Sequence, residues 1–180
     1  MSEWYTTLDG LWDRGWSLLA AGGAHRFVTL ATLSGRGPEA RLVVLRGADR
    51  ETGRLEIYTD SLSTKVRELG ADPRAALHHW TPSDDLQIRL TGAIEITTGA
   101  ALQDIWDALP APQRTSYGVK PAPGSAIASA EAYTRVPDFA QFARLTFQAD
   151  EIDIVHLGRD LHRRAEYDRA DGWQGAWRAP

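Results

Sequence analysis

Residues 57–69, IYTDSLSTKVREL, place four hydroxyl side chains and a lysine around the start of a predicted helix. A helix N-terminus carries unpaired N–H groups and a partial positive charge, so it attracts anions. Lys65 falls in the first helical turn, although a cation is normally stabilising at the opposite end, by about 0.3–1 kcal/mol. The pattern is typical of a phosphate site, and it is equally compatible with Ser61 or Ser63 acting only as a helix N-cap.

A second chemical feature is an arginine inside the apolar string EARLVVLRG, residues 39–47. Side chains alternate along a strand, so Arg41 points to the side opposite Leu42 and Val44. An arginine in this position is often a surface residue whose aliphatic stem covers apolar neighbours. A guanidinium is also well suited to bind a phosphate through two parallel hydrogen bonds. The string by itself leaves both interpretations open.

Several other chemistries have no basis in the sequence. The chain has no cysteine, which excludes disulfides, Cys-based zinc sites, iron–sulfur clusters and thiol nucleophiles. His78 and His79 are adjacent and would face opposite sides of a strand, and the histidines form neither an HxH nor an HExxH pattern. The strings GxGxxG, GxxxxGK[ST] and GxSxG are also missing. We therefore expect no metal site, and any redox chemistry must come from a bound organic cofactor.

The elements that must position these residues are mainly β. Strands are predicted at 25–33, 39–47, 54–60, 75–81, 86–97, 143–157, 163–169 and 173–178, with an Asp171-Gly172 hairpin turn before the last of them. Helices are predicted at 62–70 and 99–109, a helical turn at 138–143, and a long Pro-rich loop, of the functional or mobile kind, at 110–130. The regular strand–helix alternation of a doubly wound dinucleotide fold is missing. We expect an antiparallel barrel or sandwich.

An amphipathic helix is predicted at the N-terminus, over residues 3–20. Its apolar residues recur at spacings of three, four and seven, and they are Trp4, Leu8, Leu11, Trp12, Trp16 and Leu19. This tryptophan stripe predicts packing on a core rather than ligand binding. The length of 180 residues suits one domain covering residues 1–180.

Charge and hydropathy limit the possible partners. A net charge of -4 argues against a general nucleic-acid binder. The first residues carry no basic and apolar secretory pattern, and no stretch approaches the roughly 20 apolar residues that cross a bilayer. We expect a cytoplasmic protein that binds neither nucleic acid nor membrane.

Four strings occur in an order and at spacings that match a known family. They are RLVVLR (41–46), IYTDSLSTK (57–65), ELGADPRAAL (68–77) and LQIRLTGAIE (86–95), and RTSYG (114–118) and PAPGSAI (121–127) follow them. Together they resemble the pyridoxamine 5′-phosphate oxidase family, in particular its oxidase-related branch with unassigned substrates. The resemblance implies an FMN-binding split β-barrel of antiparallel, Greek-key type. It also implies a homodimer with FMN at the subunit interface.

The same resemblance implies which residues form the site. The implied FMN contacts are Arg41, Leu42, Val43, Val44, Leu45, Arg46, Tyr58, Thr59, Thr64, Lys65, Gln87, Ser125 and Arg164. Among them Arg41, Thr64 and Lys65 would bind the phosphate, and Ser125 would reach FMN from the second subunit. The implied contacts of a small-molecule substrate are Arg46, Arg114, Ser116 and His162. No catalytic acid or base is implied, because oxidases of this family rely on flavin hydride chemistry.

Departures from the family pattern concern the substrate. In DLHRR (160–164), Asp160 replaces the first arginine of an R-x-H-x-R pattern, and its charge would repel a phosphorylated substrate. An aliphatic residue, Ile154, replaces a tryptophan that stacks on the flavin. The tyrosine and arginine that bind substrate phosphate lack clear equivalents, with Trp106 near the first and Arg114 the nearest to the second. Cofactor binding is therefore better supported than vitamin B6 oxidation.

The expected function is an FMN-dependent oxidoreductase with an unidentified small substrate. One alternative is a non-catalytic flavin-binding protein, such as a sensor or carrier. Another is a split barrel that has exchanged FMN for haem or a deazaflavin, in which case His78 and His79 would be of interest.

Overall fold

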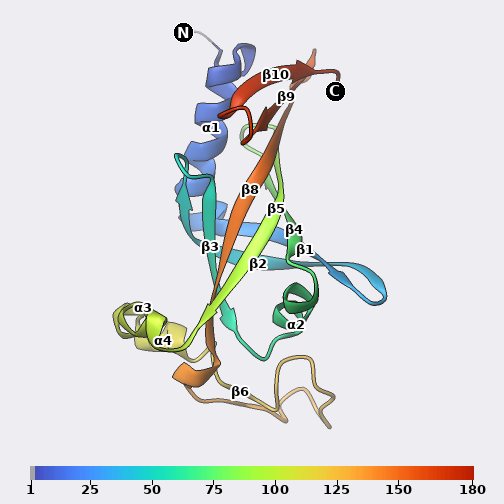
Figure 1. Ribbon diagram of the computed structural model, residues 1–180. Helices are drawn as coiled ribbons and strands as arrows, with labels where there is room; N and C mark the ends of the chain where they lie inside the picture. The colour runs from blue at the N-terminus through green and yellow to red at the C-terminus, as the bar shows by residue number, and fades with distance from the viewer. Residues whose placement is uncertain (1–2) are drawn as a thin grey trace.

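The protein, seen in a computed structural model that describes residues 3–180, is built around a closed antiparallel barrel (Figure 1). The barrel strands are β1 (Phe27–Ser34), β2 (Gly37–Asp49), β3 (Arg54–Asp60), β4 (Arg74–Thr81), β5 (Leu86–Thr98) and β8 (Phe142–Leu157). Their order is β8-β3-β2-β1-β4-β5, and the ring closes because β8 also pairs with β5. Strand β4 returns beside β1 after the meander β1-β2-β3, which is the Greek-key arrangement. The predicted mainly β, antiparallel, Greek-key split barrel is confirmed.

Strand β8 is shared between the barrel and an extension of the sheet. Residues 142–148 pair with β3, and farther along the same edge residues 151–157 pair with β9 (His162–Asp168). Strand β10 (Gln174–Arg178) continues this extension. On its other edge β8 follows β5, with an irregularity at Gly92. A Cβ at Gly92 would lie 2.0 Å from the carbonyl oxygen of Gln148, so only glycine allows this approach.

Short helices and two short strands complete the described chain. They are η1 (Trp4–Thr6), α1 (Leu8–Ala20), η2 (Gly23–Arg26), α2 (Thr64–Ala71), η3 (Gly99–Leu102), α3 (Gln103–Ala108), α4 (Ala111–Arg114), β6 (Val119–Lys120), β7 (Thr134–Arg135) and η4 (Phe139–Gln141).

The predicted elements are present, with differences at their ends. The predicted 3–20 helix is divided at Thr7, whose hydroxyl accepts a hydrogen bond from the Gly10 N–H at 3.1 Å and so caps α1. Residues 25–26 belong to η2 rather than to the first strand, and the 99–109 helix begins as the 3-10 turn η3. The predicted loop at 110–130 contains α4 and β6.

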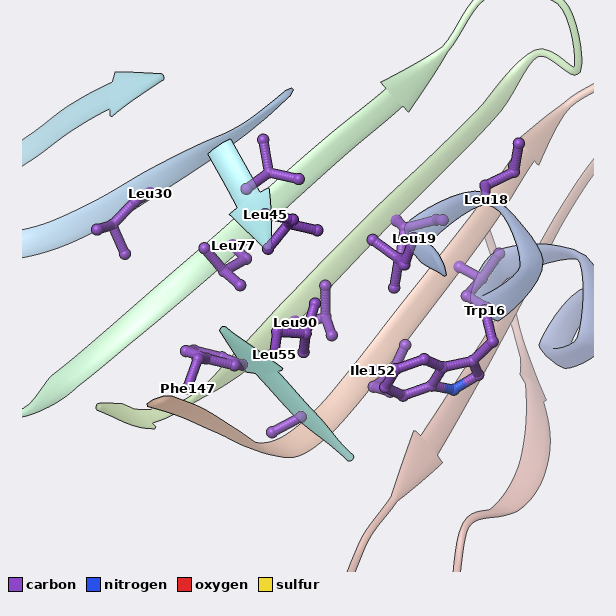
Figure 2. Packing of buried hydrophobic residues seen from close by; sticks show 14 of the residues in the cluster. Trp16, Leu18, Leu19, Leu30, Leu45, Leu55, Leu77, Leu90, Phe147 and Ile152 are labelled. Carbon is purple, nitrogen blue, oxygen red and sulfur yellow. The ribbon is translucent and has the colours of Figure 1, made fainter. Parts of the chain in front are cut away.

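The core fills the barrel and continues under α1. Leu30, Leu55, Leu77, Leu90 and Phe147 are fully buried within the barrel. Helix α1 lays its apolar stripe, including Trp16, Leu18 and Leu19, against the same cluster (Figure 2). The prediction that the tryptophan stripe packs on the core is therefore confirmed for α1.

The two ends of the molecule differ in composition. The start of α1, β9, β10 and the C-terminus lie at one end, and α2, α3, α4 and the segment around β6 lie at the other (Figure 1). Among the described residues, no helix combines the length and the apolar character needed to cross a membrane.

Candidate cofactor-binding site

A cavity of about 350 Å³ opens where β2, β3, the start of α2 and the segment after α4 meet. Its lining residues are Leu42, Val43, Val44, Arg46, Ile57, Tyr58, Thr59, Asp60, Ser63, Lys65, Ser116, Tyr117 and Pro123. This volume lies within the usual range of small-molecule sites. Most of the FMN contacts predicted on β2, β3 and α2 are in this set, together with the predicted substrate contacts Arg46 and Ser116.

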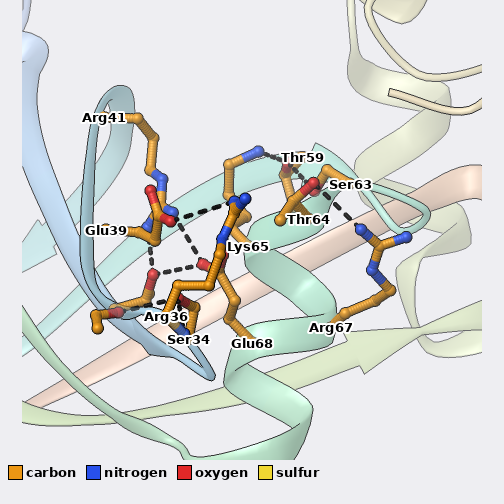
Figure 3. Close-up of polar contacts among 12 residues, drawn as sticks. Ser34, Arg36, Glu39, Arg41, Thr59, Ser63, Thr64, Lys65, Arg67 and Glu68 are labelled. Carbon is orange, nitrogen blue, oxygen red and sulfur yellow. Dashed lines mark hydrogen bonds and ion pairs between the residues drawn. The ribbon is translucent and has the colours of Figure 1, made fainter. Parts of the chain in front are cut away.

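Lys65 forms the cationic end of the cavity. Its Nζ donates to the Thr59 hydroxyl at 3.1 Å, and that hydroxyl lies 3.4 Å from the Ser63 hydroxyl (Figure 3). None of the ion pairs within residues 3–180 includes Lys65. Burial, followed by the charge of Arg41, lowers the pKa of Lys65. A half-buried ammonium without a counter-ion is stabilised by an anion bound in the cavity.

The start of α2 adds to this positive potential. Ser63 is the N-cap residue, yet its hydroxyl makes no capping hydrogen bond. The first turn of α2 also contains no acidic side chain. The helix N-terminus is therefore uncompensated next to Lys65, as a phosphate site requires. Ser63 therefore occupies the N-cap position without the predicted side-chain cap, and the anion site stays a prediction.

Arg41 points away from the cavity, toward α2. Its Nη2 donates to the Glu68 carboxylate at 2.8 Å, and its Nη1 also contacts the Thr32 hydroxyl (Figure 3). The Thr32 hydroxyl donates to the same Glu68 oxygen at 2.6 Å. Glu68 is buried, so this guanidinium balances a carboxylate that would otherwise be unpaired. The phosphate contact of Arg41 stays a prediction. In the structure the Arg41 guanidinium forms an ion pair with Glu68.

Arg46 reaches the cavity because the pairing of β2 with β3 is irregular. The register shifts between Leu45 and Gly47, which leaves Arg46 as the extra residue of a bulge, and a bulge redirects a side chain. Its guanidinium carbon lies 5.9 Å from the centre of the Tyr58 ring. Its Nε is buried and has no hydrogen-bond partner among the described residues. Arg46 therefore retains a donor that a ligand can satisfy.

Tyr58 and Tyr117 make part of the wall aromatic. Tyr117 is buried against Phe142, with ring centres 4.9 Å apart, and Tyr58 contacts the same ring edge-on at 5.4 Å. Burial raises the pKa of both tyrosines, so both stay protonated at neutral pH. They can therefore offer apolar faces and hydroxyl donors, but no negative charge.

Several predicted site residues near this end do not line the cavity. Arg114 donates to the carbonyl oxygens of Leu109 at 2.9 Å and Asp107 at 2.8 Å, so it satisfies carbonyls at the C-terminal end of α3. Leu45 is buried in the barrel, and Ser125 is exposed. Thr64 is exposed beside the cavity, where its hydroxyl would lie 3.0 Å from a Cβ on Gly124.

Gln87, Arg164 and His162 lie on another face of the protein. Gln87 pairs with Val155 and Val155 pairs with Arg164, so Gln87, Val155 and Arg164 form one row on the outer face of β5, β8 and β9. His162 pairs with Leu157 and lies two positions before Arg164, on the same face of β9. Arg164 donates two hydrogen bonds to the carboxylate of the buried Asp153, from Nε at 3.0 Å and from Nη2 at 2.9 Å. None of the three predicted residues lines the cavity.

Ile154 was predicted to take the place of the flavin-stacking tryptophan, and the structure contradicts this prediction. Ile154 is fully buried, and its Cδ1 lies 2.8 Å from where a Cβ on Gly15 would be. Ile154 therefore packs under α1 and cannot face a ligand on the outer surface. Val155 is the half-buried aliphatic residue that points outward, in the row with Gln87 and Arg164. Neighbouring residues of a strand face opposite sides, so a one-residue error reverses the assignment.

Five lining residues are not among the predicted contacts, namely Ile57, Asp60, Ser63, Tyr117 and Pro123. Asp60 ends the string IYTD, and its place at the junction of β3 and α2 was visible, but its partners were not. Tyr117 lies within RTSYG, where nothing local distinguishes a buried tyrosine from an exposed one. Only the packing of the 115–118 segment on Phe142 places it at the site.

The fold and the cavity define a split-barrel protein with a small-molecule site that is cationic at one end. Residues 1–98 match the family model described as pyridoxamine 5′-phosphate oxidase, FMN-binding domain. The chain therefore belongs to this family. The matched part includes β1 to β5 and α2, and it excludes the segment that contributes Ser116, Tyr117 and Pro123 to the cavity.

Curated relatives share this part most clearly. A pyridoxine/pyridoxamine 5′-phosphate oxidase of Azorhizobium caulinodans is 45% identical over 75 residues, which are 41% of this chain and 34% of the relative. One from Ralstonia pickettii is 31% identical over 158 residues, which are 82% of this chain and 66% of the relative. The chain thus spans between one third and two thirds of the length of these relatives.

Solved structures share the whole architecture. A pyridoxamine 5′-phosphate oxidase-related, FMN binding protein from Nostoc punctiforme has a TM-score of 0.71 at 24% identity, covering 100% of this chain and 99% of that one. PhzG from Burkholderia lata, solved with tetrahydrophenazine-1-carboxylic acid, has a TM-score of 0.74 at 20% identity, covering 97% and 92%. At these identities the two structures establish the fold.

Proposed function

We propose that this protein is an FMN-binding oxidoreductase of the pyridoxamine 5′-phosphate oxidase-related type, acting on a small molecule. The observation that carries the proposal is Lys65, a half-buried ammonium at the N-terminus of α2 that forms no ion pair with a carboxylate in the described part of the chain. Charge-assisted hydrogen bonds contribute roughly 1.5–3 kcal/mol each, and micromolar affinity needs about 8 kcal/mol in all. A phosphate held by Lys65 and the helix N–H groups supplies much of that total, and ring burial supplies the rest.

Different residues of the cavity bind different parts of FMN. Lys65 and Thr59 bind the phosphate end, and Arg46 offers its free Nε to the ring or to the substrate. Tyr58 and Tyr117 supply protonated aromatic walls that exclude water. When bound, FMN supplies hydride transfer, and the chain contributes binding, orientation and electrostatics.

The substrate is proposed to be a small molecule other than a phosphorylated B6 vitamer. Arg46 and Ser116 are placed to contact it, since both line the cavity. Asp160 is exposed in the turn before β9, close in sequence to His162, and its carboxylate disfavours a phosphate there.

A homodimer is proposed because the candidate site is divided between two faces of one chain. The cavity is on one face, and Gln87, Arg164 and His162 are on another. Exposed apolar side chains lie on the outer face of the barrel strands: Phe27 is 46%, Leu42 72% and Trp80 40% exposed. A second copy seated on this face would cover them and carry its own Gln87 and Arg164 toward the cavity.

The environment of His79 supports a flavin over haem. His79 is buried, its Nδ1 lies 3.2 Å from the Phe27 carbonyl oxygen, and its Nε2 lies 2.9 Å from the Thr81 hydroxyl. Both ring nitrogens are thus engaged inside the protein and are poorly placed for an iron.

Titration of the purified protein with FMN and haem tests the proposed function. We expect flavin absorbance on the protein and saturable binding of FMN, together with a dimer by light scattering. Reduction of the bound flavin by a screen of small organic reductants separates an enzyme from a carrier. A colourless protein that rejects added FMN, or one that takes up haem with a Soret band, would overturn the proposal.

A further inference from the structure

Asp60 joins two distant parts of the chain through its carboxylate. One oxygen accepts a hydrogen bond from the Leu62 N–H at 2.8 Å, within the β3–α2 turn. The other accepts from the N–H groups of Gly118 at 3.0 Å and Val119 at 3.4 Å, which lie 58 and 59 positions later in the chain. Asp60 itself is only 5% exposed. A buried carboxylate that accepts several backbone N–H groups is a strong and directional anchor.

The position of this carboxylate needs an explanation, because it lines the same cavity as Lys65. A carboxylate facing a bound phosphate would repel it, and Asp60 forms no ion pair with Lys65 within the described residues. Its oxygens are instead occupied by backbone N–H groups on both sides. Asp60 therefore acts on Lys65 only through space, by raising its pKa, and its direct contacts point to the chain segment on the opposite wall.

That segment, residues 115–124, is here called the strap. Ser116, Tyr117 and Pro123 of the strap line the cavity, so the cavity has this wall only while the strap is in place. Gly118 has a φ of 123°, and a Cβ there would lie 1.9 Å from the Val136 carbonyl oxygen. At Gly118 the strap therefore packs closely against residues 136–138, in a conformation that favours glycine.

Beyond this anchor the strap is held by the packing of Tyr117 on Phe142 and by hydrogen bonds to residues 135–138. The Asp138 N–H donates to the Tyr117 carbonyl at 2.9 Å, and Arg135 donates to the Thr115 carbonyl at 3.1 Å. Residues 124–137 are exposed throughout. Asp60 thus supplies the buried polar link between the strap and the strand that carries Tyr58 and Thr59.

We propose that Asp60 is a positioning residue that fixes the strap as a wall of the cofactor cavity. This inference rests on the proposed function for the identity of the ligand, but the anchor itself exists without FMN. Loss of the carboxylate removes the two strap hydrogen bonds and so loosens this wall, and it also removes the acceptor of the Leu62 N–H and a negative charge near Lys65. The strap then controls how fast FMN leaves, and the phosphate contacts control how well FMN is distinguished from riboflavin.

The test compares Asp60→Asn and Asp60→Ala with Asp49→Asn in the full-length protein. Asp49 is the matched control, since its carboxylate also accepts two backbone N–H groups, those of Glu51 and Thr52, in a turn outside the cavity. Amide hydrogen exchange is measured at Gly118 and Val119 in the FMN-free protein. FMN and riboflavin affinities and the FMN release rate are measured by flavin fluorescence.

In Asp60→Ala we expect exchange at Gly118 and Val119 to accelerate by at least about tenfold, since hydrogen bonds to a charged acceptor are among the strongest in proteins. FMN release should accelerate by about the same factor, with no fall in the FMN-to-riboflavin affinity ratio, because the lost carboxylate does not attract the phosphate. Asp60→Asn should show a smaller change, because one amide oxygen still accepts, and Asp49→Asn should show none at these amides.

If Asp60→Ala fails to fold, Gly118→Ala replaces it, because the added methyl displaces the strap from the other side. Unchanged exchange at Gly118 and Val119 in a folded variant would overturn the proposal. So would a selective loss of FMN over riboflavin, which would make Asp60 part of the phosphate site. Failure of the wild-type protein to bind FMN would overturn the proposed function, and the exchange measurement would still decide the anchor.

Discussion

Replacing Lys65 removes an ammonium of the cavity that an anion would stabilise. Its ammonium is half-buried, is held by the Thr59 hydroxyl at 3.1 Å, and has no carboxylate partner within residues 3–180. In the FMN-free protein this charge therefore lowers the stability of the fold, and in the FMN complex it becomes a phosphate contact. Lys65→Met, which keeps most of the aliphatic stem, should have opposite effects on stability and on binding.

The expected loss of FMN affinity in Lys65→Met follows from the loss of one charge-assisted hydrogen bond. Such a bond contributes roughly 1.5–3 kcal/mol, which corresponds to an increase of about 10- to 100-fold in the Kd for FMN. Riboflavin has the same ring system but no phosphate, so its Kd should change by less than about twofold. The expected signature is therefore a collapse of the FMN-to-riboflavin ratio, rather than a general loss of flavin affinity.

The sign for stability follows from the lowered pKa of Lys65 in the folded protein. The unfolded chain holds this proton more tightly, so the charged lysine disfavours folding below its folded pKa, and this cost disappears as the pH rises above 10.5. Lys65→Met should consequently raise the melting temperature of the FMN-free protein at pH 7. It should lower the additional stabilisation that FMN gives.

Flavin fluorescence titration and thermal unfolding, each with and without ligand, measure both effects. Lys120→Met is the matched control, since Lys120 is the other lysine of the chain, is exposed, and does not line the cavity. Equal losses of FMN and riboflavin affinity would refute the phosphate role of Lys65. A clear drop in the stability of FMN-free Lys65→Met would refute the idea that its charge is uncompensated.

Three further predictions concern the fold. Arg41→Ala leaves Glu68 buried without its cation and should lower the free energy of unfolding by about 3–5 kcal/mol in urea, whereas unchanged stability would contradict this pairing. Burial, and then the charge of Arg163, lowers the pKa of His156, so the folded protein favours the neutral ring. Stability should therefore decrease as the pH falls below 6.5. His156→Phe should flatten this dependence when the melting temperature is measured against pH. Gly92→Ala places a Cβ 2.0 Å from a backbone oxygen. It should lower the free energy of unfolding by more than about 2 kcal/mol in the same urea measurement. A neutral result would mean that β5 and β8 separate easily at this point.

The split between the cavity and the Gln87–Arg164 row has a consequence for mutagenesis. Within one chain these residues lie on different faces, so Arg164→Ala should not alter the Lys65 end of the cavity. If the proposed homodimer forms, the same change should weaken FMN binding across the interface. Arg164 is also bound to Asp153, so Asp153→Asn should reproduce part of that effect by releasing the guanidinium fork.

The sequence by itself determined the strands, the N-terminal helix and the strings of the site. Alternating apolar residues with Gly, Pro and Asp turns specify short antiparallel strands locally, and the tryptophan spacing specifies one helical face. The string at 57–65 likewise placed Lys65 at a helix N-terminus, because strand end, hydroxyl residues and helix start are neighbours in the chain. These features depend on contacts within a few residues.

Only the tertiary structure decided which partners the polar residues have. Arg41 is a plausible phosphate ligand in the sequence, and its pairing with Glu68 appears only once α2 packs against β1, the strand beside β2. Asp60 meets Gly118 across 58 positions, and no local pattern encodes such a contact. Arg46 enters the cavity through a bulge that depends on the register of β2 and β3. Ion pairs, bulges and anchors between distant segments arise from the packing of elements, so local alternation and spacing do not predict them.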